Sequence, residues 1–422
     1  MKLYQHQIEG LKATEGMNHV AYYWDMGLGK TFEGSEKMIQ LGAKVNLIVC
    51  QKSKIDDWID HFKQNYIYTT VIDLTKPFGI GGFMECVNGL GARIVGVINY
   101  DLLWRRPELL QLKDFTLMLD ESSLIQNETA KRSKFILKMN PKNVILLSGT
   151  PTGGKYEKLW SQMHLLGWNI SKQLYWRQFV NVEYLDTVGR SIPIVTGYKN
   201  VDRLKRKMNE YGCQFLKTDE VFDLPSQTFT KVRIPASKEY RIFRKEKIVQ
   251  IGDAELVGDT TLTRMLYERM LCGMYSEAKL KAFTDLVEST EDRLIVFYNF
   301  KEELRQLETV CINASRTHGA VNGSVKDLSA YERHSDSITF IQYQAGAMGL
   351  NLQKANKIIY FTLPLSSELY EQSKKRIHRI GQDQPCFYYQ LIVKGSIEEK
   401  ILQTLEMRKD FTEKLFEKDE EK

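Results

Sequence analysis

Short apolar runs along the chain are separated by longer, more polar segments of helical periodicity. This alternation is typical of parallel sheets wrapped by helices, so it predicts an α/β fold. The runs that predict strands are residues 19–24, 45–50, 93–100, 115–120, 143–148, 294–298, 338–343, 357–362 and 387–393. They fall into two groups, which predict two parallel-sheet lobes.

Strand signals fade between the groups, and the segment between them is predicted to be mostly helical. After Ser396, which has a capping-box spacing to Glu399, apolar residues recur at near-helical intervals and predict a long amphipathic helix. We expect this helix to pack back on the second lobe; the alternative is that it binds a partner. The expected domains are an N-terminal lobe at 1–155, a helical insert at 156–280, a C-terminal lobe at 281–395 and a terminal helix at 396–422.

Length and composition fit this organisation. The chain has 422 residues, enough for two α/β domains, and 43% hydrophobic with 27% charged residues is ordinary for a globular protein. The 59 basic and 53 acidic residues give a net charge of +6. This mild excess permits a polyanionic partner, but enzymes that act on small molecules have similar balances.

The six cysteines are scattered without C-x-x-C spacing, which favours reduced, mostly buried residues over disulfides or a zinc site. No apolar run approaches the length of a membrane span, and the start MKLYQHQIEG is unlike a secretory signal. We therefore expect no membrane partner and a location in the cytoplasm, of a bacterium or a phage-infected host, or in another reducing compartment.

The segment DMGLGKT, residues 25–31, follows an apolar strand and opens a helix. Backbone N–H groups of such a glycine-rich turn can surround phosphate oxygens at the positive end of the helix. Lys30 would reach the outer phosphates and Thr31 would hold Mg²⁺. An ordinary glycine-rich turn is the alternative, because Trp24 stands where the strict motif has glycine. The predicted nucleotide contacts here are Met26, Gly27, Leu28, Gly29, Lys30 and Thr31.

In LMLDESS, residues 117–123, an apolar strand ends in two adjacent carboxylates. Asp120 would bind Mg²⁺ and Glu121 would orient an attacking water. Asp-Glu after a strand is common by chance, but it gains weight because it follows a phosphate-loop motif.

The third motif is LSGTPTGG, residues 147–154. It is either a plain turn or a hinge that senses the γ-phosphate and relays its loss through Ser148, Gly149 and Thr150.

The fourth motif is QSKKRIHRIGQ, residues 372–382. Arg376 and Arg379 are three residues apart, which predicts that both lie on one face of a helix. They form either a solvated, anion-binding surface or a pair of arginine fingers that stabilise transition-state charge. His378, between them, is expected to be structural.

These four motifs, in this order, resemble those of superfamily-2 helicases, specifically the SWI/SNF-type ATPases of DNA translocases and chromatin remodellers. Further segments match the family, and together they span nearly the whole chain. The matching segments are LYQHQIEGL (3–11), LIVCQKSKIDDWIDHF (47–62), SLIQNETAKRSK (123–134), GYKNVDRLKRKM (197–208), QAGAMGLNLQKANKIIYF (344–361) and GSIEEKILQ (395–403).

The resemblance implies two RecA-like lobes with a C-terminal brace helix, ATP and Mg²⁺ as cofactors, and double-stranded DNA, forked or single-stranded DNA included, as partner. It makes Gln7 the adenine contact, places Gln372 at the nucleotide and gives Gly349 a coupling role. Contacts to DNA should involve mainly phosphates and sugars, so binding should be sensitive to salt and poor at reading sequence. The implied nucleic-acid contacts are Lys52, Ser53, Lys54, Tyr100, Asn299, Gln344, Ala345 and Asn351.

The chain departs from the family in places that the chemistry tolerates. The second motif is DESS where relatives often carry DEAH or DEGH, Gln51 replaces a usual proline and Trp24 a usual acidic residue. With a short insert and no reader module, the chain resembles a minimal motor core of the kind found in phage, mobile-element or bacterial genomes.

The predicted function is therefore an ATPase that hydrolyses ATP on nucleic acid and translocates along duplex DNA, remodelling forks or protein–DNA complexes. One alternative is a strand-separating helicase in replication or recombination. Another is a catalytically idle DNA-binding scaffold, which the intact Lys30, Asp120, Glu121, Arg376 and Arg379 disfavour. A switch that binds ATP without DNA is a weaker third. The sequence does not predict the protein partners.

Overall fold

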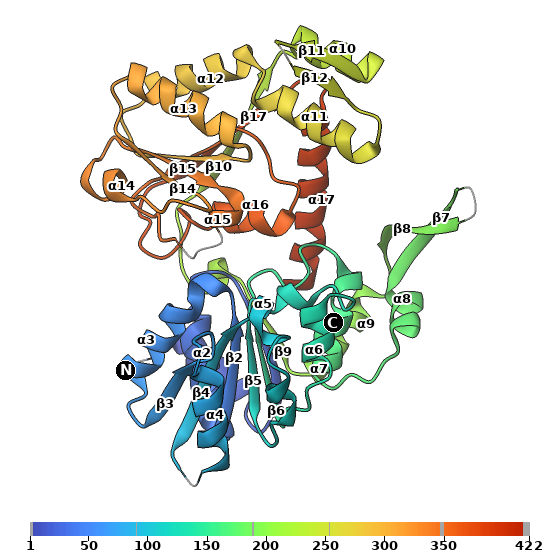
Figure 1. Ribbon diagram of the computed structural model, residues 1–422, viewed down its shortest axis with the longest axis vertical. Coiled ribbons are helices and arrows are strands. Elements are labelled where there is room, and N and C mark those ends of the chain that lie inside the picture. The colour runs from blue at the N-terminus through green and yellow to red at the C-terminus, as the bar shows by residue number, and fades with distance from the viewer. Residues whose placement is uncertain (1–2, 90, 188–189, 253, 347–349, 417–422) are drawn as a thin grey trace. The chain divides into compact units, whose positions relative to one another are not determined.

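The computed structural model describes residues 3–89, 91–187, 190–252, 254–346 and 350–416. Contacts between residues divide the chain into two compact units (Figure 1). Unit 1 runs to Val221 and includes the chain from Asp410 on, and unit 2 is Phe222–Lys409.

In the described part of unit 1, seven parallel strands form one sheet in the order β3-β4-β2-β5-β6-β1-β9. The strands are β1 His19–Trp24, β2 Val45–Cys50, β3 Thr69–Asp73, β4 Arg93–Asn99, β5 Thr116–Asp120, β6 Asn143–Leu147 and β9 Cys213–Leu216. Along β5, Leu117 and Leu119 enter one core, whereas Met118 faces Gly34 of helix α2. Both faces of the sheet are therefore covered.

Helices and 3₁₀ turns of unit 1 connect these strands. They are α1 Gln5–Ala13, α2 Lys30–Leu41, η1 Lys52–Lys54, α3 Ile55–Asn65, α4 Gly79–Asn88, α5 Tyr100–Leu103, η2 Pro107–Gln111, η3 Ser122–Ile125, α6 Lys131–Ile136, η4 Tyr156–Lys158, α7 Trp160–Leu165, α8 Lys172–Phe179, α9 Val201–Glu210 and η5 Thr218–Glu220.

Unit 2 has a second parallel sheet, six-stranded in its described residues, in the order β10-β17-β16-β13-β15-β14. The strands are β10 Gln227–Ile234, β13 Leu294–Tyr298, β14 His318–Val321, β15 Ile338–Gln342, β16 Lys357–Tyr360 and β17 Cys386–Val393. The helices are α10 Lys238–Glu246, α11 Thr261–Gly273, α12 Glu277–Glu288, α13 Lys301–Asn313, α14 Ser329–Arg333, α15 Tyr343–Gly346, α16 Ser367–Lys374 and the part of α17 Ile397–Phe416 that precedes Asp410.

Alternate residues of β13 enter separate cores on the two faces of the second sheet. Ile295 packs with residues of α16 and α17, and Val296 packs with residues of α12 and α13. Ile401 and Leu405 of α17 belong to the first of these cores. The C-terminal helix thus packs on the second lobe, as expected, and the prediction of two parallel-sheet lobes is confirmed.

The prediction that residues 156–280 are mostly helical is wrong. The segment contains two antiparallel hairpins, and it supplies β9 to the first sheet and β10 to the second. Strand β10 has mostly exposed, mixed residues, so it has no apolar run that could have predicted it. The hairpin strands are β7 Val180–Thr187 with β8 Arg190–Tyr198, and β11 Ile248–Ile251 with β12 Ala254–Val257. Within unit 1, hairpin β7–β8 extends away from the sheet (Figure 1).

The expected cysteine state is confirmed, since all six cysteines are unpaired and only Cys86 is exposed. Across the described ranges, no helix has the length and apolar character needed to cross a membrane.

Candidate active site

The glycine-rich turn joins β1 to α2. Gly27 and Gly29 have φ angles of 91° and 74°, which glycine adopts at little cost, and Gly29 forms the N-cap of α2. The Lys30 ammonium donates hydrogen bonds to the carbonyls of Trp24 (2.8 Å) and Asp25 (3.0 Å). A cation and the start of a helix therefore meet at this turn, the arrangement that suits a phosphate group.

Helix α1 packs against this turn through two adjacent side chains. Gln7 donates from Nε2 to the carbonyl of Gly29 (3.1 Å) and accepts from the Tyr4 N–H at 2.9 Å. His6 Nε2 lies 2.9 Å from the carbonyl of Leu28. A Cβ at position 29 would lie 2.5 Å from Gln7 Nε2, so a larger residue there would displace this amide as well as strain the backbone. His6 was not predicted, and its place beside Gln7 was the only signal for it.

The turn is also tied to the edge of the sheet. Asp25 accepts hydrogen bonds at 3.1 Å from both the backbone N–H and the hydroxyl of Thr218, which follows β9. This contact joins residues 193 positions apart, so no local pattern predicts it.

Asp120 ends β5, and its Oδ2 accepts a hydrogen bond from the indole of Trp58 at 2.8 Å. Burial raises the pKa of Asp120, and the Trp58 hydrogen bond and the charge of Lys30 oppose that rise. Glu121 follows with φ 55° and ψ 60°, a left-handed conformation that is unusual for a residue with a side chain. The backbone therefore turns sharply between the two carboxylates.

The Ser-Gly-Thr turn after β6 contacts both of the preceding groups. The Ser148 hydroxyl donates a long hydrogen bond of 3.4 Å to Glu121 Oε2 and accepts one of 3.1 Å from the Thr150 N–H. A Cβ at Gly149 would lie 3.1 Å from Met26 Cγ and 3.6 Å from Lys30 Nζ. Three motifs predicted separately thus meet at the carboxyl ends of β1, β5 and β6, which are neighbours in the sheet.

The side chains at this edge fit a Mg²⁺ ion bound together with phosphate better than a metal ion held by protein ligands alone. Within the described ranges, no three His, Cys, Asp or Glu side chains cluster as metal ligands. Mg²⁺ in phosphate sites needs only one or two protein oxygens and takes the rest from phosphate and water. Thr31 and Asp120 remain the residues that could supply those oxygens.

The predicted nucleic-acid residues of unit 1 have different environments. Lys52 and Ser53 are exposed in η1, and Lys54 pairs with Asp57 at 2.6 Å. Tyr100, in contrast, is 2% exposed, and its hydroxyl donates to the carbonyl of Asp120 at 2.9 Å. This burial contradicts the expected surface contact and makes Tyr100 a support of the carboxylate turn.

The expected helical face for the two arginines of unit 2 is wrong. Helix α16 ends at Lys374, and the chain continues through turns. Gln382 holds these turns, because its Nε2 donates to the carbonyls of Ala355 (2.8 Å) and Ile377 (3.3 Å). Arg376 is buried, and the Arg379 guanidinium donates to the side-chain oxygen of Asn351.

Other predicted residues of unit 2 are distributed around the sheet. The Asn299 amide donates to Thr362 Oγ1 (2.9 Å) and to the Leu363 carbonyl (3.1 Å). Gln344 is exposed on α15, which also contains Ala345, and Gln372 is buried on α16. Gly349 lies outside the described residues. His378 Nε2 lies 2.9 Å from the carbonyl of Pro225, consistent with the structural role expected for it.

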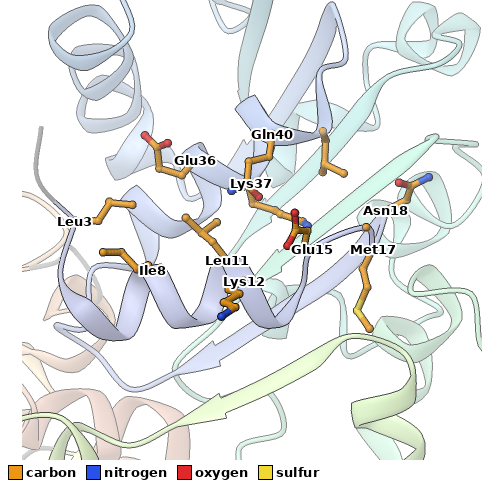
Figure 2. Close-up of a pocket in the computed structure, with 12 residues that line it drawn as sticks. Leu3, Ile8, Leu11, Lys12, Glu15, Met17, Asn18, Glu36, Lys37 and Gln40 are labelled. Carbon is orange, nitrogen blue, oxygen red and sulfur yellow. The ribbon is translucent and has the colours of Figure 1, made fainter.

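A groove of about 710 Å³ separates the outer faces of α1 and α2 (Figure 2). Apolar side chains such as Leu3 and Ile8 line it together with Glu36 and Lys37, and no predicted nucleotide contact lines it. The groove is therefore distinct from the site at the strand ends.

Comparisons with known proteins agree with the motifs. Residues 23–279 match the family model "SNF2-related domain", and residues 278–381 match "Helicase conserved C-terminal domain". The mouse protein "SWI/SNF-related matrix-associated actin-dependent regulator of chromatin subfamily A member 1" is 22% identical over 97% of this chain and 41% of its own length. The Bacillus subtilis protein "Uncharacterized ATP-dependent helicase YqhH" is 23% identical over 95% of this chain and 77% of its own length.

Among solved structures, the Sulfolobus solfataricus SWI2/SNF2 ATPase core in complex with dsDNA is similar, with 19% identity, a TM-score of 0.47, and 98% of this chain and 92% of that chain covered. The chain spans about two fifths of the length of the first curated relatives. Because the SNF2-related domain model alone matches more than half of the residues, the chain belongs to the SNF2-related family.

Proposed function

We propose that the chain is a nucleic-acid-stimulated ATPase that translocates along double-stranded DNA. One observation carries this proposal: the glycine-rich turn, the Asp120–Glu121 pair and the Ser148–Thr150 turn converge at the carboxyl ends of adjacent parallel strands. Ligands of open α/β sheets bind at this edge. The family membership supports ATP as that ligand, and the named relatives include ATP-dependent helicases.

In this proposal, Lys30 and the backbone of the turn hold the ATP phosphates, and Thr31 and Asp120 hold Mg²⁺. Bound Mg²⁺ would neutralise charge on the phosphate oxygens. Glu121 orients the attacking water, Ser148 holds the Glu121 carboxylate, and Gln7 remains the proposed adenine contact.

The second unit supplies Arg376 and Arg379 to hydrolysis, and Ser148–Thr150 and Gly349 take part in coupling. The surface residues Lys52, Lys54, Gln344 and Asn351 remain the proposed contacts to the DNA backbone. Because such contacts release counterions, affinity should fall steeply as salt rises.

ATP hydrolysis measured without nucleic acid and with RNA, single-stranded, duplex or forked DNA tests the proposal. We expect duplex DNA to raise the rate at least about tenfold, as for a site that gains transition-state contacts on closure, and Lys30→Ala to abolish turnover. Movement is tested by displacement of a third strand from duplex DNA. A rate that neither duplex nor single strands raise would refute the proposal.

A second candidate function, strand separation, is favoured by hairpin β7–β8. Tyr184 and Leu185 on this hairpin are 68% and 54% exposed. Exposed aromatic and apolar side chains on a narrow projection can stack on bases at a junction. If the chain is a helicase, replacing Tyr184 and Leu185 by alanine should stop fork unwinding but leave ATPase activity. Tyr68→Ala is the matched control, since Tyr68 is another exposed aromatic of unit 1.

A further inference from the structure

Gln162 of α7 has no exposed surface and makes three hydrogen bonds through one side chain. Its Oε1 accepts from the hydroxyls of Ser122 (2.7 Å) and Tyr23 (3.0 Å). Its Nε2 donates to the carbonyl of Pro151 at 2.8 Å. A buried amide whose oxygen and nitrogen are both engaged is fixed in orientation, because rotating it would leave polar groups unpaired.

The three partners of Gln162 stand at the ends of three adjacent strands. Tyr23 is in β1 just before the glycine-rich turn, Ser122 follows Glu121 after β5, and Pro151 follows Thr150 after β6. Ser122 and Pro151 therefore belong to the second and third motifs, and Tyr23 lies two residues before the first. One side chain from α7 reaches all three.

Ser122 is also one of the two positions, with Ser123, at which the second motif, DESS, differs from DEAH and DEGH. Its hydroxyl is fully buried and donates to Gln162. In this chain the departure from the family pattern therefore has a partner of its own, the Gln162 amide.

We propose that Gln162 is a positioning residue for ATP hydrolysis, which holds the Asp120–Ser122 turn at a fixed distance from the Ser148–Pro151 turn. The inference rests on the proposed function and deepens it. Fixing the two turns keeps the Ser148 hydroxyl within hydrogen-bonding distance of the Glu121 carboxylate. At 3.4 Å this contact is already long, so a small shift of either turn would break it. Gln162 itself touches neither nucleotide nor nucleic acid in this proposal.

A positioning role predicts a particular kinetic pattern. The contacts of Gln7 and Lys30 with the glycine-rich turn do not involve Gln162, so ATP affinity should change little. The alignment of Glu121 does depend on Gln162, so the rate of the chemical step should fall. Small misplacements of reacting groups cost up to about a hundredfold in rate.

The experiment compares Gln162→Met, Ser122→Ala and the double variant with wild type at saturating duplex DNA. Methionine keeps the length and volume of glutamine but cannot make these hydrogen bonds. We expect Gln162→Met to lower kcat at least about tenfold with KM for ATP within about threefold. Ser122→Ala should lower kcat less, and the double variant should be no slower than Gln162→Met, because both changes remove the same contact.

The matched control is Ser161→Ala, on the same helix. Ser161 is equally buried, and its hydroxyl donates to the Ile125 carbonyl at 2.8 Å, at the opposite end of η3 from Ser122. Ser161→Ala should lose a comparable hydrogen bond, with a similar fall in Tm, but keep kcat within about twofold of wild type. An equal fall of kcat in Ser161→Ala and Ser122→Ala would mean that Gln162 acts only on stability.

The outcomes separate this inference from the proposed function. Wild type without DNA-stimulated hydrolysis would refute the proposed function. If the wild type is active and both Ser122→Ala and Gln162→Met have the wild-type kcat, the positioning role is refuted and the proposed function is not. If Gln162→Met does not fold, Ser122→Ala, which removes one hydroxyl, decides by the same comparison of kcat with the Ser161→Ala control.

Discussion

Glu121, the residue proposed to orient the attacking water, has a strained backbone. A residue with a side chain at φ 55° costs about 1–3 kcal/mol and persists only where its surroundings hold it. The Tyr100 hydroxyl, which donates to the carbonyls on both sides of this turn, and the Ser148 hydroxyl supply those contacts. The strained turn sets where the carboxylate of Glu121 lies.

Glu121→Gln should therefore fold and bind ATP but lose hydrolysis. The amide keeps the shape and the Ser148 contact, but it cannot accept a proton from an attacking water. We expect turnover at least about a hundredfold below wild type and a complex with ATP and duplex DNA that persists. Duplex retention with ATP, measured beside phosphate release, checks this prediction. Turnover at the wild-type rate would mean that another group orients the water.

Glu33 makes a residue-scale prediction about pH. It is fully buried in α2, and within the described residues neither carboxylate oxygen has a hydrogen-bond partner. Burial raises the pKa of Glu33 to about 9. Folding therefore favours the protonated acid, so its contribution is fully present below the unfolded pKa of about 4.5 and is lost as pH rises toward 9.

Glu33→Gln should remove this loss. The urea midpoint of wild type should fall between pH 6 and pH 9, whereas that of Glu33→Gln should fall less. Burial lowers the pKa of Lys37, so its stabilisation grows as pH rises and works in the opposite direction. The charge of Glu33 raises the pKa of Lys37, so its loss in Glu33→Gln should only strengthen this opposing trend. If the urea midpoints of the two proteins change with pH in parallel, ionisation of Glu33 does not lower the stability of the folded state.

At the scale of elements, the nine predicted strands are the interior strands of the two sheets. The sheet strands that the sequence analysis missed, β3, β9, β10 and β14, are the edges of those sheets within the described residues. Interior parallel strands are covered on both faces and read as continuous apolar runs. Edge strands are shorter or more exposed and carry polar residues, so their pattern resembles that of loops.

The part of the candidate site that local motifs supply was predictable from the sequence, and the rest was not. Asp25–Thr31, Asp120–Glu121 and Ser148–Thr150 each have a recognisable spacing, and the structure brings them together. Trp58, Thr218 and Gln162 reach the site through side-chain hydrogen bonds to residues 11 to 193 positions away along the chain. No periodicity encodes such contacts, because they depend on how complete elements pack.

Helix α1 offers a prediction at this scale. A Cβ added at Gly10 would lie 2.5 Å from the Trp24 ring and 2.6 Å from a Glu33 oxygen. Gly10→Ala should displace α1, lower stability by about 1–3 kcal/mol and weaken ATP binding, since α1 holds Gln7 against Gly29.

The matched control is Gly81→Ala in α4, where an added Cβ meets nothing within 4 Å. Because alanine favours a helix over glycine, this variant should gain up to about 1 kcal/mol and bind ATP normally. Thermal unfolding and ATP titration compare the two variants. Equal stability of Gly10→Ala and Gly81→Ala would show that α1 tolerates a shift from the turn.

For the whole molecule, the question is whether the two units act on one reaction. Lys30 and Glu121 belong to unit 1, and Arg379 belongs to unit 2. A guanidinium that meets phosphate charge only in the transition state affects turnover far more than binding. In the structure Arg379 also donates to Asn351, a proposed DNA contact. The same arginine could therefore contact either ATP or duplex DNA, and substituting it distinguishes these two roles.

Arg379→Ala should lower DNA-stimulated hydrolysis by at least about two orders of magnitude, since arginine fingers contribute about 10³ to 10⁵ in rate. Arg379→Lys should rescue it poorly, because an ammonium lacks the planar fork of donors. Duplex affinity without nucleotide should change little, since in this proposal Arg379 contacts ATP and not the DNA backbone. Lys52→Ala is the control: an exposed lysine of unit 1 whose loss should weaken duplex binding and leave kcat at saturating DNA unchanged.

Hydrolysis against DNA concentration and duplex affinity without ATP are measured for all four proteins. If Arg379→Ala has normal turnover but greatly weakened duplex binding, Arg379 contacts DNA and not ATP. Hydrolysis would then need no guanidinium from that position of unit 2.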